Sequence, residues 1–400
     1  MLNLQHRPLF NGATGRYTTT MLFFLLACTA NTPDSGQDTA IDQHHCAVDG
    51  WSDGIREPDA DGPDTQIHIE AHFDGQRIWQ AWNRPNDNSN FDIWARIVGC
   101  DGQPITDPFE VSDSTENELD PVIAFTEGHA LIAWIASVSG GLAVRYRILD
   151  TDGVPTTGVF DLQASRNGVP VTGNATLPVV STVGDHFVMA GSWGHDDATA
   201  FQAFTVEIGV DGSILGDATD AELDTENGQT MVDMTVHSDV IHLTWQEDAT
   251  DTPDPSAWHA PLGDPAVLLG TPGARPALAA STAGVWHAWD DNAGTVYVQS
   301  PGGNPVALDL GAGFHHSPRL AVADDTVVAL VMEMDSGIYN RLRLVTLDEN
   351  GVTEDIPLSA TAAPSVYEAS VVLVDASHAV VAWQEGENPA FRAFTEWVSW

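Results

Sequence analysis

A sequence unit that recurs about seven times between Ile67 and Trp400 constrains the fold of this chain more than any other feature. Each copy has two short apolar runs, the second of which usually ends in tryptophan, followed by an alternating run and a tight turn. Repeats of roughly 40–60 residues built from short strands are typical of β-propellers. The sequence therefore predicts an all-β propeller, most simply with seven four-stranded blades, and with six or eight blades as alternatives.

One copy illustrates the four strands that we expect in each blade. Its apolar or alternating runs lie at 122–125, 130–134, 142–149 and 158–162. In the third run apolar residues alternate with Arg145 and Arg147, which is the period of a strand. The turns after the third strands carry Asp-Gly or Asn-Gly pairs, which tolerate the positive φ angles of two-residue hairpins. These pairs are Asp101-Gly102, Asp152-Gly153, Asp211-Gly212 and Asn350-Gly351.

The recurrent tryptophans predict packing between blades. They are Trp82, Trp134, Trp193, Trp245, Trp289 and Trp383, and Met332 is aligned with them in one further copy. Exposed aromatic rings would instead indicate stacking platforms for sugars. Each tryptophan ends an apolar run, however, and methionine replaces a buried aromatic side chain far better than one that stacks on a sugar.

The last copy is incomplete, because it has only three strands, at 369–374, 378–383 and 391–400. An unpaired edge in the final blade would be open to pairing with other chains, and propeller rings are usually closed by strand exchange. We therefore expect the segment from Cys46 to Trp51 to supply the outer strand of the final blade.

The charge of the chain is strongly acidic. It has 57 Asp and Glu residues against 14 basic ones, all of them arginine, for a net charge of −43. Such a field repels phosphate backbones, so nucleic acid is excluded as a partner. Cations are the natural counterpart, either as a diffuse atmosphere or in bound sites, and a purely solubilising role of the charge is the alternative.

The first residues are typical of an export signal. Arg7 and Arg16 precede the short apolar run 21–27, which is far too short to span a bilayer. The run ends in Leu-Leu-Ala-Cys28, which resembles the lipobox of bacterial lipoproteins, and this resemblance covers only the N-terminal segment. It implies acylation of Cys28 after removal of residues 1–27, and Thr29 after the cysteine favours the outer membrane or cell surface. An ordinary secretory signal is the alternative.

The domain organisation follows from this assignment. Residues 28–43 are polar and predict a flexible tether, and residues 44–400 form the propeller domain. With Cys28 acylated, Cys46 and Cys100 remain as an even pair in an oxidising compartment. A disulfide between them would join the N-terminal arm to the first blade and stabilise the fold by roughly 2–4 kcal/mol. Two buried thiols are the alternative.

Arginines recur in the third strands, at Arg96, Arg145, Arg147, Arg341, Arg343 and Arg392. Sialidases are propellers that grip a carboxylate with three arginines, but their Ser-x-Asp-x-Gly-x-x-Trp turns are absent from this sequence. The third strand also lies away from the central axis of a propeller. We therefore expect these arginines to pair with neighbouring carboxylates along the blades.

The candidate binding face carries acidic loops, because the loops before the first strand and after the second strand of each blade share one face. Their candidate ligand-binding residues are Asp92, Glu116, Glu118, Asp196, Asp197, Glu247, Asp248, Asp290, Asp291, His315 and His316. Oxygen-rich loops can bind calcium, the one candidate cofactor, and the run with Asp59, Asp61 and Asp64 resembles part of a calcium loop without its bidentate glutamate. Solvated acidic turns are the alternative.

The sequence contains no local catalytic motif. It lacks a G-x-S-x-G elbow, a P-loop, a dinucleotide fingerprint and the H-E-x-x-H or C-x-x-C spacing of zinc sites. We therefore expect a lipid-anchored propeller that binds or scaffolds a protein, a glycan or another envelope component. A glycan hydrolase that uses two carboxylates of the binding face remains an alternative, because such pairs converge only in the fold. A purely structural surface protein is the third possibility.

Overall fold

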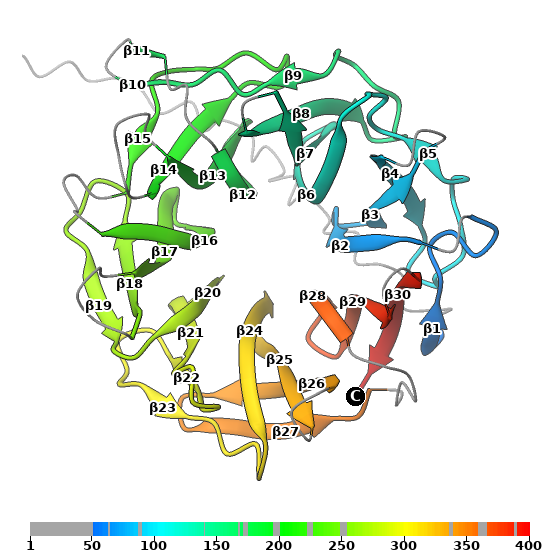
Figure 1. The fold of residues 1–400 in the computed structure, drawn as a ribbon. Coiled ribbons are helices and arrows are strands. Elements are labelled where there is room, and N and C mark those ends of the chain that lie inside the picture. The colour runs from blue at the N-terminus through cyan, green and yellow to red at the C-terminus, as the bar shows by residue number, and fades with distance from the viewer. Residues whose placement is uncertain are drawn as a thin grey trace, which may run out of the picture. The chain divides into compact units, whose positions relative to one another are not determined.

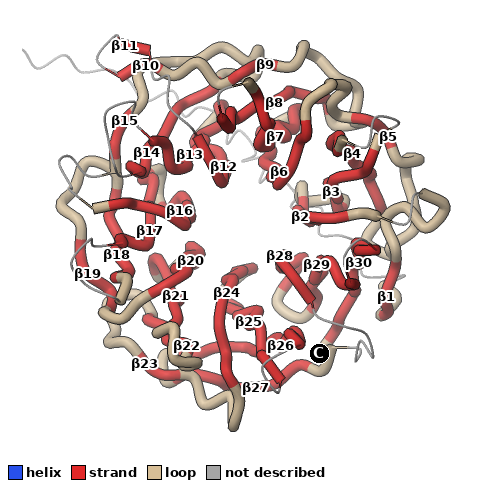
Figure 2. The backbone as a smooth tube through the Cα atoms, viewed as in Figure 1, coloured by secondary structure: helices blue, strands red, loops and turns tan. Residues whose placement is uncertain are grey.

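The computed structural model describes residues 51–400 except 63–64, 87–89, 140, 167–168, 171–174, 195–200, 222–226, 249–253, 336–338, 359–365 and 388–389. The chain divides into two compact units, Met1–Gln43 and His44–Trp400, and the described residues all belong to the second. Seven four-stranded antiparallel sheets form a ring of blades, as the sequence predicts (Figure 1). The described residues contain strands, turns and loops only (Figure 2).

Each blade has four strands, which are numbered here from the innermost, next to the central axis, to the outermost. The inner strands are β2 (Ile67–Phe73), β6 (Asn117–Thr126), β12 (Ala175–Val183), β16 (Gly228–His237), β20 (Ala274–Ser281), β24 (Phe314–Ala323) and β28 (Val366–Asp375). The second strands are β3 (Ile78–Pro85), β7 (His129–Val138), β13 (His186–Gly194), β17 (Val240–Asp248), β21 (Gly284–Asp290), β25 (Thr326–Asp335) and β29 (His378–Glu387).

The third and the outer strands of the blades are given in the same order, from blade 1 to blade 7. The third strands are β4 (Phe91–Val98), β8 (Gly141–Asp150), β14 (Phe201–Ile208), β18 (Ser256–Pro261), β22 (Val296–Gln299), β26 (Tyr339–Asp348) and β30 (Ala390–Ser399). The outer strands are β5 (Phe109–Glu110), β9 (Phe160–Asp161), β15 (Thr219–Asp220), β19 (Val267–Gly270), β23 (Val306–Ala307), β27 (Gly351–Ile356) and β1 (Gly54–Arg56), and a small hairpin, β10 (Ser165–Arg166) and β11 (Val169–Pro170), follows blade 2.

An N-terminal strand closes the ring, but it lies further along the chain than predicted. The outer strand of blade 7 is β1, which pairs with β30 from Gly54 opposite Trp397 to Arg56 opposite Thr395. Closure by an N-terminal strand is therefore confirmed, with the strand a few residues beyond the segment around Cys46 to Trp51. Trp51 packs its ring on His378 instead, at 4.7 Å between ring centroids, so this residue caps the blade and the strand begins three residues later.

The closing strand makes the same contacts as the other outer strands. A Cβ atom at the turn residue Gly153 of blade 2 would lie 2.7 Å from Phe109 Cζ in the outer strand of blade 1. A Cβ atom at Gly102 of blade 1 would likewise lie 2.5 Å from Arg56 Cζ in β1. Both glycines have positive φ angles. The glycines of the three Asp-Gly turns have the predicted positive φ angles, and their lack of a side chain lets the outer strands of blades 7, 1 and 2 approach the turn of the next blade.

The recurrent tryptophans are buried between blades, as predicted, with at most 2% of each ring exposed. Their alignment needs correction in blades 3 and 6, however. The strand register makes Trp82 equivalent to Gly191 and to Val331, so Trp193 and Met332 do not occupy that place. Trp193 lies two residues further on, which keeps it on the same side of its strand, where it stacks on Phe204 at 4.0 Å.

Met332 lies one residue beyond the equivalent position, so its side chain is on the opposite face of blade 6. Val331, which is fully buried, packs towards blade 5 in its stead. Alignment by residue type failed here because neighbouring positions of these fully buried second strands are all apolar.

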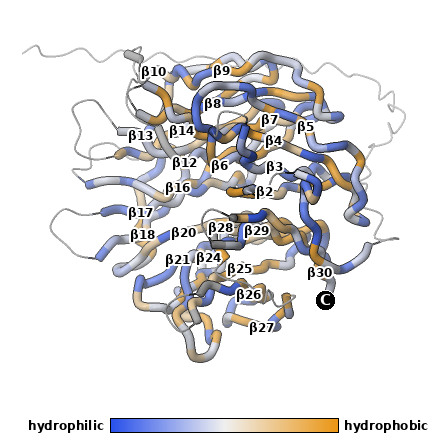
Figure 3. The backbone as a smooth tube through the Cα atoms, turned by 45° about the vertical axis from the view of Figure 1, so that its right-hand side comes forward, coloured by the Kyte–Doolittle hydropathy of each residue, from blue (hydrophilic) through white to orange (hydrophobic). Residues whose placement is uncertain are grey.

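Hydrophobic clusters fill the interfaces between neighbouring blades, such as the one that joins blades 1 and 2 around Trp134. The hydrophobic residues run along the strands, for example in β2 and β30 (Figure 3). The interface between blades 4 and 5 differs, because it contains three histidines. His242 Nδ1 lies 3.1 Å from His259 Nε2, and the ring of His259 lies 4.4 Å from that of His287 in blade 5.

This histidine interface predicts a loss of stability in acid. Burial, reinforced by the neighbouring His259 and His242, lowers the pKa of His287 to about 3, and burial lowers the pKa of His259 to about 4. The unfolded chain, in which histidine titrates near 6.5, therefore takes up protons first as the pH falls. The free energy of unfolding should be constant above pH 6.5 and should decline below it, by at most about 1.4 kcal/mol per pH unit for each histidine.

Urea unfolding at pH 7.5 and at pH 5.0 measures this loss. We expect His287→Leu to lose less stability than the wild type between the two pH values. His129→Leu, at a surface turn, is the control and should keep the wild-type difference. Equal pH dependence of the wild type and His287→Leu would contradict the assignment.

Candidate functional site

Every blade has a β-bulge at the same place in its inner strand. The pairing of inner and second strands shifts register between Ile67 and Glu70 in blade 1, and between Leu119 and Val122 in blade 2. Equivalent shifts occur in the other five blades. The bulge lies near the start of the inner strand. It is therefore close to the upper face, which we define as the face that carries the loops before the first and after the second strand of each blade.

The bulged residue has a left-handed backbone in six of the blades. These residues, which we call the axial ring, are His68 (φ 54°), Asp120 (φ 55°), Met231 (φ 49°), Arg275 (φ 47°), Ser317 (φ 51°) and Glu368 (φ 44°). A non-glycine residue in this region costs on the order of 1 kcal/mol, and recurrence in six blades indicates that the bulge belongs to the architecture. The side chains differ from blade to blade, so one backbone geometry presents six different chemical groups.

Three members of the axial ring converge although they come from blades 1, 2 and 7. His68 Nδ1 contacts Asp120 Oδ1 and lies 3.0 Å from Glu368 Oε2. One ligand atom from each residue lies within 4.8 Å of the other two. Blade 1 separates blades 2 and 7 in the ring, so their side chains can meet only on its axial side. The backbone N–H of His68 donates to Gln384 Oε1 at 2.7 Å, which ties the bulge to blade 7.

The charge of this cluster is unbalanced. Burial lowers the pKa of His68 to about 4 and raises the pKa of Glu368, and Arg319 opposes the second of these shifts. Among the described residues, neither Asp120 nor Glu368 forms an ion pair with an arginine. The side chains of His68, Asp120 and Glu368 are 19%, 26% and 53% exposed, so solvent reaches the cluster.

A second set of polar residues faces the axis two positions beyond the bulges. It contains Glu70 of blade 1, Asp233 of blade 4 and Arg319 of blade 6. Burial raises the pKa of Glu70 to about 7, an effect that Arg319 opposes and Asp233 reinforces. Burial also raises the pKa of Asp233, again against Arg319. Arg319 therefore interacts electrostatically with acidic groups of two other blades.

The axial ring also contains a well-supported ion pair. Arg275 Nε donates to Asp290 Oδ2 at 2.8 Å, and Asp290 is fully buried. The same carboxylate accepts the backbone N–H groups of Asn292 and Ser317, each at 3.0 Å. Asp290 thus connects blades 5 and 6 through hydrogen bonds. It also holds Arg275 in place at the upper end of the axis.

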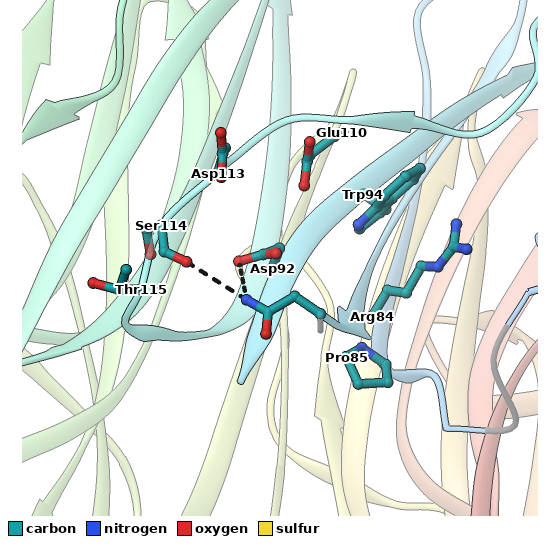
Figure 4. A pocket seen from close by; sticks show the side chains of 9 residues that line it. Arg84, Pro85, Asp92, Trp94, Glu110, Asp113, Ser114 and Thr115 are labelled. Atoms are coloured by element: carbon teal, nitrogen blue, oxygen red, sulfur yellow. Dashed lines mark hydrogen bonds between the residues drawn. The ribbon is translucent and has the colours of Figure 1, made fainter. Parts of the chain in front are cut away.

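A separate pocket of about 490 Å³ lies on the upper face at blade 1, away from the axis (Figure 4). The carboxylates of Asp92, Glu110 and Asp113 line it, and the Arg84 guanidinium covers the ring of Trp94 at 4.1 Å. Burial raises the pKa of Asp92 and of Glu110, and the mutual repulsion of the acidic groups adds to both shifts. These carboxyl groups therefore hold their protons to higher pH than ordinary ones.

Most of the loop residues singled out from the sequence are held apart by local bonds. Glu116 and Glu118 both accept from Arg145 Nη1, at 2.7 and 3.2 Å. Glu247 accepts from Asn227 and Asp248 from Gln246, while Asp291 accepts two backbone N–H groups of its own turn. His315 is buried, and His316 Nδ1 lies 2.9 Å from Ser317 Oγ. Asp196 and Asp197 lie outside the described residues.

The proposed calcium run is only partly described. Asp59 is buried and pairs with Arg84 at 3.0 Å, and Asp61 lies in the following turn. Asp64 lies outside the described residues, so calcium binding by this run stays a prediction.

The cysteine predictions also remain open. Cys28 and Cys46 lie outside the described residues. Cys100 is buried in the cluster between blades 7 and 1, beside the closing strand, where Arg56 Nη2 donates to the Asp101 carbonyl at 3.2 Å. Arg56 of the closing strand therefore contacts the residue that follows Cys100.

The third-strand arginines bind within and between blades. Arg145, Arg343 and Arg392 pair with carboxylates, as predicted. Arg96 and Arg147 donate to backbone carbonyls instead, including Pro58 O at 2.8 Å and Val111 O at 2.7 Å of the preceding blade. None of these five arginines belongs to the axial ring.

Sequence reasoning missed the axial ring, because its members share no residue type. A partial signal is proline, which follows three of its six members. Asp120-Pro121, Arg275-Pro276 and Ser317-Pro318 place proline directly after the bulged residue, just before an apolar run. Proline has no N–H to donate and is tolerated in sheets at bulges, so an X-Pro pair at the start of a repeat marks the axial position.

Comparison with known proteins defines the class of this protein by fold alone. No protein-family model matches the chain, and no curated protein sequence matches it. It is similar to the polysaccharide lyase Uly1, with 8% identity, a TM-score of 0.54 and coverage of 85% of this chain and 90% of the lyase. A protein of unknown function from Dyadobacter fermentans gives 10% identity, a TM-score of 0.51 and coverage of 86% and 99%.

A third similar structure is Trypanosoma rangeli sialidase in complex with the inhibitor DANA. The identity is 10% and the TM-score 0.50, with coverage of 83% of this chain and 55% of the sialidase. At these identities the likeness concerns architecture, and the chain is a seven-bladed β-propeller. Within its described part, the structure has no helix that is long and apolar enough to cross a membrane.

Proposed function

We propose that this protein is a lipid-anchored propeller of the cell envelope that binds a glycan at the upper end of its central axis. The observation that carries the proposal is the axial ring. Seven blades repeat one bulge, and in six of them the bulged residue has a left-handed backbone and a different side chain. A frame that repeats with side chains that vary is the usual arrangement of a binding site on a propeller.

The lipobox-like sequence before Cys28 and the polar tether after it support the anchor and the envelope location. The net charge of −43 disfavours polyanionic ligands, so the glycan should be neutral or carry amino groups. Polysaccharide lyase Uly1 and an arabinanase from Penicillium chrysogenum with arabinobiose, at a TM-score of 0.50, are propellers of similar architecture. Their substrates support a glycan as the first ligand class to test.

The test is glycan-array binding followed by calorimetry with the full-length protein. Met231 is exposed in the axial ring, and Met231→Trp should obstruct the upper end of the axis while changing little in the fold. We expect it to weaken glycan binding at least about tenfold, which corresponds to about 1.4 kcal/mol. Val240→Trp is the matched control, because Val240 is an exposed residue of the same blade at the opposite face.

The control should bind as the wild type does. Absence of glycan binding by the wild type, or equal losses in both variants, would contradict an axial glycan site.

Glycan hydrolysis in the blade 1 pocket is a second candidate function. It is favoured by the three carboxylates that gather there and by the raised pKa of Asp92 and Glu110, since a glycosidase needs one carboxyl group that stays protonated. Incubation of the protein with the glycans that it binds discriminates hydrolysis from simple binding. New reducing ends that are formed by the wild type and lost in Glu110→Gln would establish hydrolysis in place of simple binding.

A further inference from the structure

We propose that His68, Asp120 and Glu368 form a binding site for one divalent transition-metal ion at the upper end of the axis. The site rests on the convergence of one nitrogen and two oxygen atoms within 4.8 Å of one another. It lies in the region assigned to glycan binding and deepens that function, but its metal chemistry stands on these three residues alone.

The three polar atoms of the cluster compete for a single proton. A single ring nitrogen, Nδ1, faces both Asp120 Oδ1 and Glu368 Oε2. That nitrogen carries at most one proton, so it can donate a hydrogen bond to one carboxylate at full strength but not to both. Arg319 attracts the Glu368 carboxylate at longer range, but among the described residues no arginine forms an ion pair with either carboxylate. A metal ion between the three atoms would satisfy all of them at once.

The backbone holds the three ligands in place. Each comes from the bulge of a different blade, at φ angles between 44° and 55°, so the ligand positions are fixed by the closed ring and not by a mobile loop. The His68 N–H to Gln384 bond further fixes the histidine. A site built on rigid elements in this way loses little conformational entropy when the ion binds.

The ligand set indicates which metal the site would take. Calcium and magnesium prefer oxygen ligands throughout, whereas imidazole with carboxylates suits zinc, manganese and similar ions. Three protein ligands leave at least one coordination position for water or for a ligand, as in catalytic zinc sites. Because Glu368 is 53% exposed, that position would be accessible from the upper face.

Metal titration of the chelator-treated full-length protein tests the site, with Zn²⁺, Mn²⁺ and Ca²⁺ as separate probes. We expect saturable binding of one Zn²⁺ or Mn²⁺ per chain with weaker Ca²⁺ binding, and loss of affinity of at least about tenfold in Asp120→Asn and in Glu368→Gln. Co²⁺ should give an absorption spectrum of a nitrogen- and oxygen-ligated ion that His68→Gln abolishes.

Two control variants separate this site from the acidic surface. Glu354→Gln removes an exposed carboxylate of the outer strand β27, and Val240→Trp changes an exposed residue of the opposite face. Both should bind metal as the wild type does. Binding that is not saturable at one ion, or that is equal in Asp120→Asn and Glu354→Gln, would overturn the proposal.

The metal and glycan proposals can fail separately. Metal titration needs no glycan, and Met231→Trp leaves all three metal ligands in place. Metal binding without any glycan binding would therefore uphold this inference and reject the proposed function. Glycan binding by a protein that binds no metal would uphold the proposed function and reject the metal site.

Discussion

A chain that lacks residues 44–57 is expected to lose at least about 3 kcal/mol of stability, because the ring can no longer close. The deletion removes the pairing of β1 with β30, the Arg56 guanidinium that lies 4.4 Å from the Trp397 ring centroid, and the Glu57 partner of Arg392. It also exposes the edge of β30, which favours association with other chains. Guanidinium unfolding and light scattering measure the two effects.

Two controls accompany this deletion. A chain that lacks only residues 1–43 should be as stable as the full-length protein, because β1 is retained. Cys46→Ser removes the predicted disulfide but keeps the strand, so it separates the contribution of the cross-link from that of β1. If the deletion of 44–57 were no less stable than Cys46→Ser, strand closure would not contribute to stability.

Replacement of Trp134 by alanine is expected to lower the free energy of unfolding by about 3–5 kcal/mol. Trp134 is fully buried in the cluster between blades 1 and 2, where Ile93, Val111 and Ile123 surround it. The cavity would therefore lie inside an interface that the rigid ring cannot collapse. Denaturant unfolding monitored by circular dichroism measures the loss.

Trp134→Phe is the matched variant, because it keeps an aromatic ring and should recover most of the stability. A loss below about 1 kcal/mol in Trp134→Ala would indicate a surface role for the residue, in conflict with its burial.

The sequence was sufficient to predict the fold because its repeats carry the architecture. Alternation in the third strands, Asp-Gly turns and a tryptophan at the end of the second strand are local signals, and each one repeats. The alignment of the second strands was wrong where neighbouring residues are equally apolar. Val331 and Met332 are both apolar, so only the strand register distinguishes the residue that faces blade 5.

The ends of the closing strand were misplaced for a related reason. Gly54–Arg56 is too short for a periodic pattern, and its place is set by contacts with residues far away in the sequence, namely Trp397 and Gly102. A three-residue strand of this kind is recognisable only after the ring is known.

The candidate site was the least predictable part of the molecule. His68, Asp120 and Glu368 are separated by 52 residues or more along the chain, and no spacing rule links them. The acidic loops attracted attention because they are rich in carboxylates, but Glu118 and Asp290 use their charge to hold arginines within the fold. In a propeller a site forms where different blades meet at the axis, and a single sequence shows this only indirectly.

Anomalous scattering at the zinc absorption edge, from crystals of the full-length protein grown with Zn²⁺, would locate an ion bound at His68, Asp120 and Glu368. We expect one strong anomalous peak bounded by His68 Nδ1, Asp120 Oδ1 and Glu368 Oε2. The three side chains should then surround the ion at the upper end of the axis. A map with no peak at that position, or with peaks only among the acidic groups of the outer surface, would contradict it.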